Sequence, residues 1–561
     1  MFRAVSAVFL GAAMAFVSPT QADEAFAERA VEVLQSVYSS DAPGAVVVVS
    51  RDGEVIIEHG VGMADLELGV ALHPDHVFRL ASVTKQYSAA GLLKLVEEGR
   101  VSLDDPLSKY LPDFPVGDVT IAQLLNHTSG IKSYTGIEGY MTSDRIRADL
   151  DTDELIAVFA DEPVDFPPGE KYAYNNSGYV LVGAVIEAVT DQPWNEYLRE
   201  ELLLPQGIEN TDAYGDDEIV PGRVEGYDGT PDDIKRTSFL SMTQPHAAGA
   251  LMATAADVDR WQVALHNGEI LGEDLYARMT TPEGAAAEED YGFGIASGTW
   301  FGQPALSHGG GIFGFVTHAL HLPEERLSVV VLSNRAIPGW GPQDVALRLA
   351  GLATGRSYPI EAPRVDWTDD ESLALQGTYR IDDEENRTIR FEEGTLISQR
   401  AGGPEFEVYP VEGDRLAFEQ SLSWFSIERD ESGAVAAVAL HNAWGGEPER
   451  AERISDEVQV REGVDVPVEQ LERLVGRYEL QPGFVMTVRI KDGGLEIQAT
   501  GQPAIPVEAE SATRFFSNRV GADIEFHLPE AGPAESLTLF QRGQELPAPR
   551  IGDADEAASD G

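Results

Sequence analysis

A repeat in the last third of the chain places the tightest constraint on how it folds. The segment Leu-Gln-Gly-Thr-Tyr at residues 375–379 returns as Leu-Val-Gly-Arg-Tyr at residues 474–478, an offset of 99 residues. The same offset relates Gly394 to Gly493, Leu396 to Leu495 and Leu440 to Leu539. Self-similarity at a fixed period marks repeated structural units, and the short alternating apolar runs here are typical of strands. The sequence therefore predicts two consecutive all-β modules of roughly 80–90 residues, each a small antiparallel barrel.

The chain before residue 356 has a mixed pattern of strands and helices. Residues 44–50, an Asp-Gly turn and residues 55–57 predict a β-hairpin, and residues 313–322 and 327–333 predict a second one. Helical periodicity predicts helices at residues 25–37, 82–98, 120–126, 178–190 and 344–352, with two more that begin near residues 193 and 254. Strands at both ends with helices between them predict an α+β fold, with one antiparallel sheet formed by both ends.

Changes in composition and in the pattern of apolar residues along the sequence predict the domain boundaries. Arg3, an apolar run at residues 4–17 and small residues ending at Ala22 predict a signal peptide at residues 1–22, cleaved near Ala22. We then expect the α+β domain at 23–355, a linker at 356–370, the first barrel at 371–455, a second linker at 456–470, the second barrel at 471–552 and a disordered acidic tail at 553–561.

Charge and composition exclude several classes of function. The 40 Lys and Arg against 95 Asp and Glu give a net charge of −55, so no nucleic-acid partner is expected. No stretch after the signal peptide is long and apolar enough for a membrane span. A chain that is exported without any cysteine suits a bacterial periplasm or the medium. The acidic surface is typical of proteins from salty surroundings, or else favours cationic substrates through a field that salt screens over about 8 Å.

The segment Ser82-Val83-Thr84-Lys85 opens the predicted helix at residues 82–98. Lys85 lies on the same side of the first helical turn as Ser82, and the helix N-terminus adds partial positive charge there. A serine hydroxyl is a weak nucleophile until a base takes its proton, and a desolvated lysine is such a base. The pattern predicts that Ser82 is an acylated nucleophile on a helix with one buried face.

The Ser-x-x-Lys pattern is weakly specific by itself, because the chain contains it twice. The second copy runs from Ser129 to Lys132 and lies between a helix end and a glycine-containing loop. No helix follows this copy to fix the geometry of its serine and lysine. The context therefore favours Ser82.

Tyr174 and Asn176 form a second candidate element, just before the predicted helix at residues 178–190. A phenolate at Tyr174, held by Lys85, would take the Ser82 proton or return a proton to the leaving group. The Asn176 amide can hydrogen-bond both Lys85 and a substrate amide. The alternative is an ordinary turn in which an asparagine caps the helix.

His308-Gly309-Gly310-Gly311 forms a third element, which runs into the predicted strand at residues 313–322. Consecutive glycines let backbone N–H groups approach a ligand closely. One of these amides, with Gly311 the preferred candidate, would join the Ser82 amide as an oxyanion hole. The alternative is a glycine-rich strand entry with an incidental histidine.

These three motifs, in this order, resemble the serine penicillin-recognising enzymes, which include class C β-lactamases, D,D-carboxypeptidases, related esterases and D-aminopeptidases. The family pattern of S-x-x-K, Y-x-N and then K-T-G or H-x-G matches Ser82–Lys85, Tyr174–Asn176 and His308–Gly310. Residues 124–130 and 249–261 also look like the family, so the resemblance covers roughly residues 40–335. It implies a β-lactamase-like fold, an acyl-enzyme on Ser82 and proton transfer by Lys85 and Tyr174.

One departure from the family pattern bears on the substrate. Many members have a lysine where His308 stands and hold a substrate carboxylate with that cation, whereas histidine is mostly neutral above pH 7. The D-aminopeptidases resemble this chain in having histidine there and two β-barrel domains after the catalytic one. Their specificity for a free N-terminal amine comes partly from a loop of the barrel region, which this sequence does not locate.

The sequence thus predicts an exported serine hydrolase that acts on a small-molecule or short-peptide substrate without a metal or organic cofactor. Peptides and amides that contain D-amino acids are the favoured substrates. The alternatives are an esterase, a weak β-lactamase or D,D-carboxypeptidase and, outside the enzymes, a penicillin- or peptidoglycan-binding protein.

Overall fold

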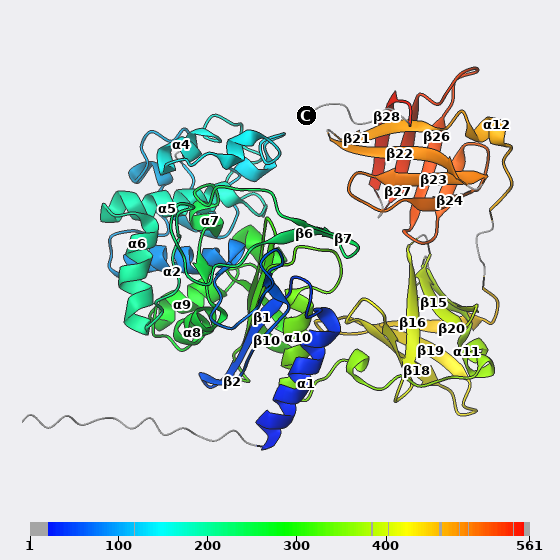
Figure 1. Cartoon of the computed structure of the whole chain (residues 1–561), viewed down its shortest axis with the longest axis horizontal. Helices are drawn as coiled ribbons and strands as arrows, with labels where there is room; N and C mark the ends of the chain where they lie inside the picture. Colours follow the sequence, from blue (N-terminus) through cyan, green and yellow to red (C-terminus); the bar gives the residue numbers. More distant parts are fainter. Residues whose placement is uncertain are drawn as a thin grey trace, which may run out of the picture. The chain divides into compact units, whose positions relative to one another are not determined.

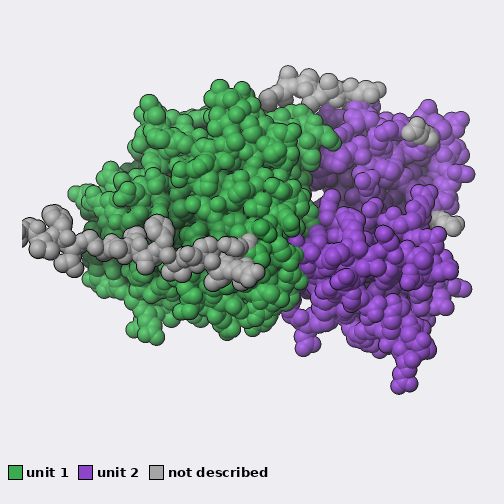
Figure 2. Space-filling view, turned by 60° about the horizontal axis from the view of Figure 1, so that its bottom comes forward, with its two compact units in different colours: residues 1–357 green, residues 358–561 purple. Residues whose placement is uncertain are grey.

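The computed structural model of the chain describes residues 21–116, 118–382, 385–401, 403–458, 463–481, 483–491, 493–541 and 544–554. These residues form two compact units, divided between Ser357 and Tyr358 (Figure 2). The predicted signal peptide, apart from its last two residues, and the predicted tail, apart from its first two, lie outside the described residues.

A six-stranded antiparallel sheet forms the centre of the first unit (Figure 1). Its strand order is β2-β1-β12-β11-β10-β9, so the N-terminal hairpin pairs with the last strand of the unit, with Ala45 opposite Ser333. The predicted α+β fold with one sheet shared by both ends is confirmed. The strands are β1 (Ala45–Arg51), β2 (Glu54–Val61), β9 (Ala296–Trp300), β10 (Gln303–Ile312), β11 (Phe315–Leu322) and β12 (Leu327–Ser333).

Both faces of the central strands are buried, which explains the unbroken valine run in β1. The strand has no solvent face, so apolar side chains occupy both sides of the pleat. Helices α1 (Gln21–Val37) and α10 (Pro342–Thr354) pack against β2, β11 and β12, and α8 (Ala255–His266) packs against β1 and β12. Figure 1 shows α10 and α8 on opposite sides of the sheet.

Helix α2 (Thr84–Glu97), which follows the short turn η1 (Ala81–Val83), is the centre of the helical part of the unit. It is buried on nearly all sides, against α5 (Asn176–Thr190), α6 (Trp194–Leu198) and α7 (His246–Gly249) among others. The predicted burial of one face only is therefore wrong, and the polar side chains of α2 are enclosed with their own partners. Gln86 accepts a hydrogen bond from Gln262 at 2.6 Å, and Ser88 donates one to the Ala247 carbonyl at 2.7 Å.

The second unit contains two closed barrels of eight strands, in which sequential strands pair antiparallel. This confirms the predicted fold class of the C-terminal region. The first barrel consists of β13 (Gly377–Arg380), β14 (Asn386–Glu392), β15 (Thr395–Arg400), β16 (Glu405–Val411), β17 (Arg415–Phe418), β18 (Trp424–Arg429), β19 (Val435–His441) and β20 (Glu449–Ser455). The second consists of β21 (Gly476–Gln481), β22 (Phe484–Lys491), β23 (Gly494–Ala499), β24 (Ile505–Ala509), β25 (Arg514–Ser517), β26 (Ala522–His527), β27 (Ser536–Gln541) and β28 (Gln544–Gly552).

The repeated tyrosine makes the same hydrogen bond at the start of each barrel. The Tyr379 hydroxyl donates to the Leu375 carbonyl, and the Tyr478 hydroxyl donates to the Leu474 carbonyl at 2.7 Å. Both tyrosines are fully buried. The repeated leucine and tyrosine thus tie the segment before the first strand to that strand.

The repeated glycine provides space for an arginine from the last strand of the same barrel. A Cβ atom on Gly377 would lie 2.9 Å from Nε of Arg453, and one on Gly476 would lie 2.7 Å from Nε of Arg550. These arginines lie on β20 and β28, which pair with β13 and β21 to close the barrels. We call the repeated leucine, glycine and tyrosine, with this arginine, the closure latch.

The region expected to be a linker, residues 356–370, contains regular structure. It includes a short turn at Pro359–Glu361 and the start of helix α11 (Asp369–Leu375). Thr368 caps this helix and accepts a hydrogen bond from the Glu371 backbone N–H. A capped helix therefore precedes the first barrel, and the short helix α12 (Val468–Leu471), which has no side-chain cap, precedes the second.

Candidate active site

Ser82 lies in the turn η1 that leads directly into α2. The residue before it, Ala81, has a φ of +51°, a conformation that is strained for a residue with a side chain. Neighbouring segments fix this turn. The Leu80 N–H donates to the Leu251 carbonyl and the Leu80 carbonyl accepts from the Thr317 hydroxyl, each at 2.8 Å.

Lys85 is fully buried and lies beside Ser82. Its Nζ is 3.2 Å from Ser82 Oγ, and it donates to Asn176 Oδ1 and to the Ala248 carbonyl, each at 2.8 Å. All three partners are neutral groups. Burial lowers the pKa of Lys85 well below its usual value, because an ammonium is poorly stabilised away from water. The free amine that can accept the Ser82 proton is therefore favoured.

Tyr174 lies within hydrogen-bonding reach of Ser82, and the centre of its ring is 4.8 Å from Lys85 Nζ. Tyr174 is 40 % exposed. Burial raises the pKa of Tyr174 above its usual value, and the hydrogen bond with Ser82 only partly opposes this. The structure thus favours a neutral phenol, rather than the phenolate expected from the sequence, and leaves Lys85 as the base.

Asn176 bridges Lys85 and a neighbouring loop. Its Oδ1 accepts from Lys85, its Nδ2 donates to Thr135 Oγ1 at 3.1 Å, and its backbone N–H donates to Ser133 Oγ at 3.2 Å. The preceding residue, Asn175, is the N-cap of α5. The helix-cap alternative therefore applies to Asn175, which leaves the Asn176 side chain to orient the Lys85 amine.

The second Ser-x-x-Lys copy has a different structure. Lys132 forms an ion pair with Asp165 at 3.0 Å, and both side chains are partly exposed. Ser129 is buried, and its Oγ accepts a long hydrogen bond of 3.4 Å from the Ile131 N–H. The serine and lysine of this copy thus have separate partners.

His308 is buried and has a partner at each ring nitrogen. Its Nδ1 is 2.6 Å from the Gly309 carbonyl, and its Nε2 is 2.8 Å from the Tyr291 hydroxyl. Burial, with a smaller contribution from Lys85, lowers the pKa of His308 to about 3, so the ring is neutral. Because a carbonyl only accepts, Nδ1 donates and Nε2 accepts from Tyr291. His308 therefore offers no cation to a substrate carboxylate.

The predicted His-Gly-Gly-Gly stretch lies inside β10 and is paired with β11 throughout, rather than at a strand entry. A Cβ atom on Gly310 would lie 2.3 Å from both the Leu80 carbonyl oxygen and Thr317 Oγ1. Glycine at this position thus lets β10 approach the turn that carries Ser82. Gly309 lies beside the His318 ring, where a Cβ atom would be 3.6 Å from Nδ1.

A pocket of about 130 Å³ opens beside the nucleophile. Ser82, Asn176 and Gly311 line it, so the structure brings together one residue from each predicted motif. The rest of the lining is largely apolar and consists of Ala81, Tyr134, Thr135, Met141, Leu240, Pro245, Ala248, Gly249, Ile312 and Phe313.

Several residues around the site were not predicted from the sequence. Tyr291, Thr135 and the Ala248 carbonyl hold His308, Asn176 and Lys85. They come from loops and a short helix with no characteristic spacing to the motifs. A carbonyl contact is independent of residue type, so no signal in this single sequence identifies it.

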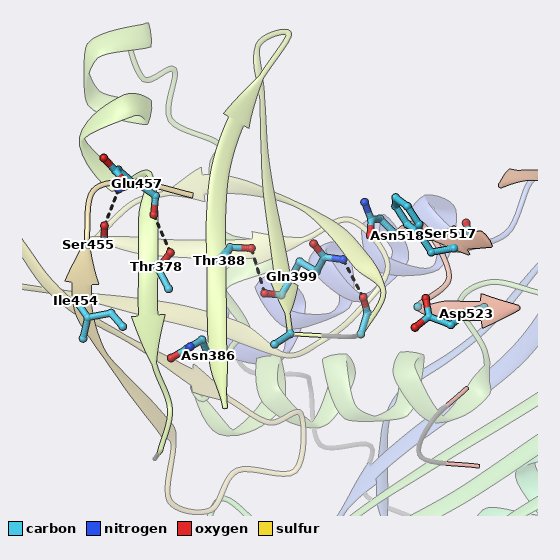
Figure 3. A pocket seen from close by; sticks show the side chains of 15 residues that line it. Thr378, Asn386, Thr388, Gln399, Ile454, Ser455, Glu457, Ser517, Asn518 and Asp523 are labelled. Carbon is cyan, nitrogen blue, oxygen red and sulfur yellow. Dashed lines mark hydrogen bonds between the residues drawn. The ribbon is translucent and has the colours of Figure 1, made fainter. Parts of the chain in front are cut away.

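A larger pocket of about 430 Å³ lies in the second unit (Figure 3). Neutral polar side chains are the most numerous kind in its wall, and no lysine or histidine is among the described residues that line it. The labelled residues are Thr378, Asn386, Thr388, Gln399, Ile454, Ser455, Glu457, Ser517, Asn518 and Asp523. The serines and threonines of this described lining thus have no lysine or histidine among their neighbours in it, unlike Ser82, which contacts Lys85.

Comparisons with known proteins bear on the fold and the family of the chain. The Beta-lactamase family matches residues 23–353, and a domain of unknown function (DUF3471) matches residues 460–550. The chain is 28% identical over 432 residues to a D-aminopeptidase of Gluconobacter oxydans, across 75% of each protein. It is 25% identical over 536 residues to a D-aminopeptidase of Cereibacter sphaeroides, across 93% of this chain and 92% of that protein. The octameric penicillin-binding protein homologue from Pyrococcus abyssi shares the fold, with a TM-score of 0.52, 22% identity, and coverage of 76% of this chain and 99% of that chain.

Proposed function

The chain belongs to the Beta-lactamase family and is a serine hydrolase, and from that premise we propose that it is exported and forms an acyl-enzyme on Ser82. One observation carries the proposed acyl-enzyme, namely the 3.2 Å contact between Ser82 Oγ and the buried amine of Lys85. We further propose that small amides and peptides that contain D-amino acids are its substrates.

The proposed reaction uses Lys85 as the base. As Ser82 Oγ bonds to the substrate carbonyl carbon, Lys85 accepts the hydroxyl proton and the carbonyl oxygen becomes negatively charged. Backbone N–H groups at Ser82 and Gly311 are the candidates to stabilise that charge. Tyr174 gives its proton to the leaving nitrogen as the C–N bond breaks, and takes the proton held on Lys85. Water then releases the acid by the same route and restores the Ser82 hydroxyl.

The neutral His308 supports the proposed substrate class. The loss of a charge-assisted hydrogen bond to a substrate carboxylate costs about 1.5–3 kcal/mol, or roughly a tenfold to hundredfold in binding. Such a loss disfavours efficient D,D-carboxypeptidase or β-lactamase action. The similarity of the chain to the two D-aminopeptidases named above, one aligned over almost the whole chain, also supports the proposal of D-amino-acid amides as substrates.

A substrate panel tests this proposal. D- and L-alanyl p-nitroanilide, p-nitrophenyl acetate and a chromogenic cephalosporin are assayed with the wild-type chain and with Ser82→Ala. We expect the D-alanyl anilide to be the best amide substrate, and the variant to be inactive on every member. A preference for the acetate over both anilides would support the esterase alternative. Turnover that is unchanged in Ser82→Ala would overturn the assignment of Ser82.

Export is a separate part of the proposal and rests on the pattern of residues 1–22. The Beta-lactamase match begins at residue 23, directly after it. The full chain is expressed in a bacterium, and its N-terminus is sequenced from the cytoplasmic, periplasmic and medium fractions. A periplasmic or secreted chain that begins near Asp23 is expected, whereas an unprocessed chain confined to the cytoplasm contradicts export.

A further inference from the structure

The segment that carries Tyr174 is attached to His127 on both sides of the tyrosine. The Ala173 N–H donates to the His127 backbone carbonyl at 3.0 Å, and the Asn175 N–H donates to His127 Nδ1 at 3.1 Å. One residue thus receives the backbone N–H groups that precede and follow Tyr174. These two bonds limit how far the Tyr174 backbone can move.

The His127 ring also contacts the Tyr174 ring. The ring centres are 4.3 Å apart at an angle of 44°, the shortest of the contacts that His127 makes with four tyrosine rings. His127 is 1 % exposed, whereas Tyr174 is 40 % exposed and has less packing of its own. The buried ring therefore supports the more exposed one.

The protonation state of His127 suits this arrangement. Its Nδ1 accepts a hydrogen bond, so a neutral ring carries its proton on Nε2, which has no hydrogen-bond partner among the described residues. Burial, followed by the nearby Lys85 and His308, holds the pKa of His127 well below its usual value. The ring stays neutral, and Nδ1 remains an acceptor.

The backbone conformation of His127 belongs to the end of a helix, where the Thr128 N–H donates to the Gln123 carbonyl at 3.0 Å. Its φ is +60°, a left-handed conformation that is uncommon for residues other than glycine. The conformation follows directly after α3 (Ile121–Leu125) and its C-cap, Asn126. The helix end thus presents the buried His127 ring, with its unpartnered Nε2 donor, to the Tyr174 ring and to the Asn175 N–H.

We propose that His127 is a positioning residue for the reaction, which holds the Tyr174 hydroxyl at Ser82 through its Nδ1, its carbonyl and its ring. The inference rests on the proposed function and adds a residue to it. A displacement of about 1 Å in a reacting group lowers turnover by up to roughly a hundredfold. The loss of the Nδ1 acceptor should therefore lower kcat far more than it raises KM.

Three variants test the proposal in the full chain. His127→Phe keeps a ring and removes the acceptor, and we expect kcat to fall about 10- to 100-fold with KM within about threefold. His127→Asn places an amide oxygen where Nδ1 was and tolerates the left-handed backbone, so it should recover most of that loss. His321→Phe is the matched control, because His321 is also buried with one bonded ring nitrogen but lies near the far end of β11, and it should leave kcat unchanged.

A double-mutant cycle separates positioning from general damage. If His127 acts through Tyr174, then His127→Phe added to Tyr174→Phe lowers kcat by less than about twofold further. A full additional loss in that background overturns the proposal, as does an unchanged kcat in His127→Phe alone. If thermal unfolding shows that His127→Phe does not fold, His127→Gln replaces it, and the same two outcomes decide the question.

A second measurement does not depend on turnover. In protein labelled with ¹³Cζ-tyrosine, the Tyr174 signal is assigned through Tyr174→Phe. We expect this signal to shift in His127→Phe, to return toward its wild-type position in His127→Asn, and to stay unchanged in His321→Phe. A wild-type chain that hydrolyses no panel substrate refutes the proposed function alone, whereas an unmoved Tyr174 signal in His127→Phe refutes the positioning role.

Discussion

The two Ser-x-x-Lys copies of this chain share a sequence pattern, but their lysines differ in burial and in the groups that they contact. In the first copy, serine and lysine are 3.2 Å apart, and the lysine is wholly buried among neutral partners. In the second, Lys132 is paired with Asp165 in a partly exposed position. The pattern places the two side chains three residues apart. The surroundings decide whether the lysine is a free amine or an ordinary surface cation.

The second copy also supports the first. The residues directly after Lys132 include Ser133 and Thr135, which accept hydrogen bonds from the backbone and side chain of Asn176. Asn176 in turn accepts from Lys85. The loop that begins with the second copy thus holds a residue that orients the base of the first.

Removal of each serine hydroxyl in turn should give the largest difference in kcat between the two copies. Ser82→Ala is expected to lower kcat by roughly 10⁴- to 10⁶-fold, because the atom that forms the acyl bond is lost. Ser129→Ala should stay within about threefold of wild type, since its hydroxyl makes only a long hydrogen bond. Steady-state hydrolysis of the best panel substrate measures both. A large loss in Ser129→Ala with an active Ser82→Ala would reverse the comparison.

Substitution of each lysine in turn should give the next largest difference in kcat between the two copies. The pH dependence of wild-type kcat/KM should then show whether the Lys85 amine acts as the base. Lys85→Gln is expected to lower kcat about 10²- to 10⁴-fold, and Lys132→Gln less than about twofold. Burial lowers the pKa of Lys85 well below its usual value, so wild-type kcat/KM should reach its plateau at a lower pH than it would with an ordinary lysine, and should fall as acid protonates Lys85. With an ordinary lysine pKa of about 10.4, activity would instead rise about tenfold per pH unit up to pH 10. A profile of that shape would show that Lys85 is charged in the free enzyme.

Two glycine substitutions should have different effects, one mainly on kcat and the other mainly on the free energy of unfolding. In Gly310→Ala the new methyl group overlaps the Leu80 carbonyl and Thr317, which moves the Ser82 turn, and kcat should fall by up to about 10²-fold. In Gly130→Ala the methyl group overlaps the Phe166 carbonyl at a φ of +70°, so unfolding should become easier by about 1–3 kcal/mol. Kinetics and thermal unfolding of both variants test the assignment. Equal effects of the two variants on kcat would argue against it.

The smallest effect is expected at the surface ion pair of the second copy. Because Lys132 and Asp165 are both partly exposed, Asp165→Asn should change the free energy of unfolding by less than about 1 kcal/mol. Even that difference should shrink in 1 M NaCl, where charges are screened. Chemical denaturation at two salt concentrations measures it. A larger effect that persists in salt would mean that this pair is structural.

Much of the fold followed from the sequence, because its determinants are local or periodic. Turn residues and strand periodicity predicted the hairpins, a repeat predicted the barrels, and the resemblance to a known family is confirmed by the match over residues 23–353. The burial of α2 did not follow, because Thr84, Gln86 and Ser88 imply a solvent-facing side. Their hydrogen-bond partners come from segments far away in the chain. The spacing of apolar residues within a helix does not predict such contacts.

The candidate site was predicted only in part, for a related reason. Side chains with a fixed spacing, such as Ser82 with Lys85, were found from the sequence. Residues that only orient another side chain have no fixed spacing in the sequence to that side chain. Tyr291, which hydrogen-bonds His308, is an example. The protonation state of Tyr174 also depends on enclosure, which composition does not show.

The closure latch implies an origin for the second unit. Leucine, glycine, tyrosine and arginine occupy corresponding places in both barrels, although most strand residues differ between them. Such a pattern is what duplication of a single ancestral segment leaves behind once the copies have diverged.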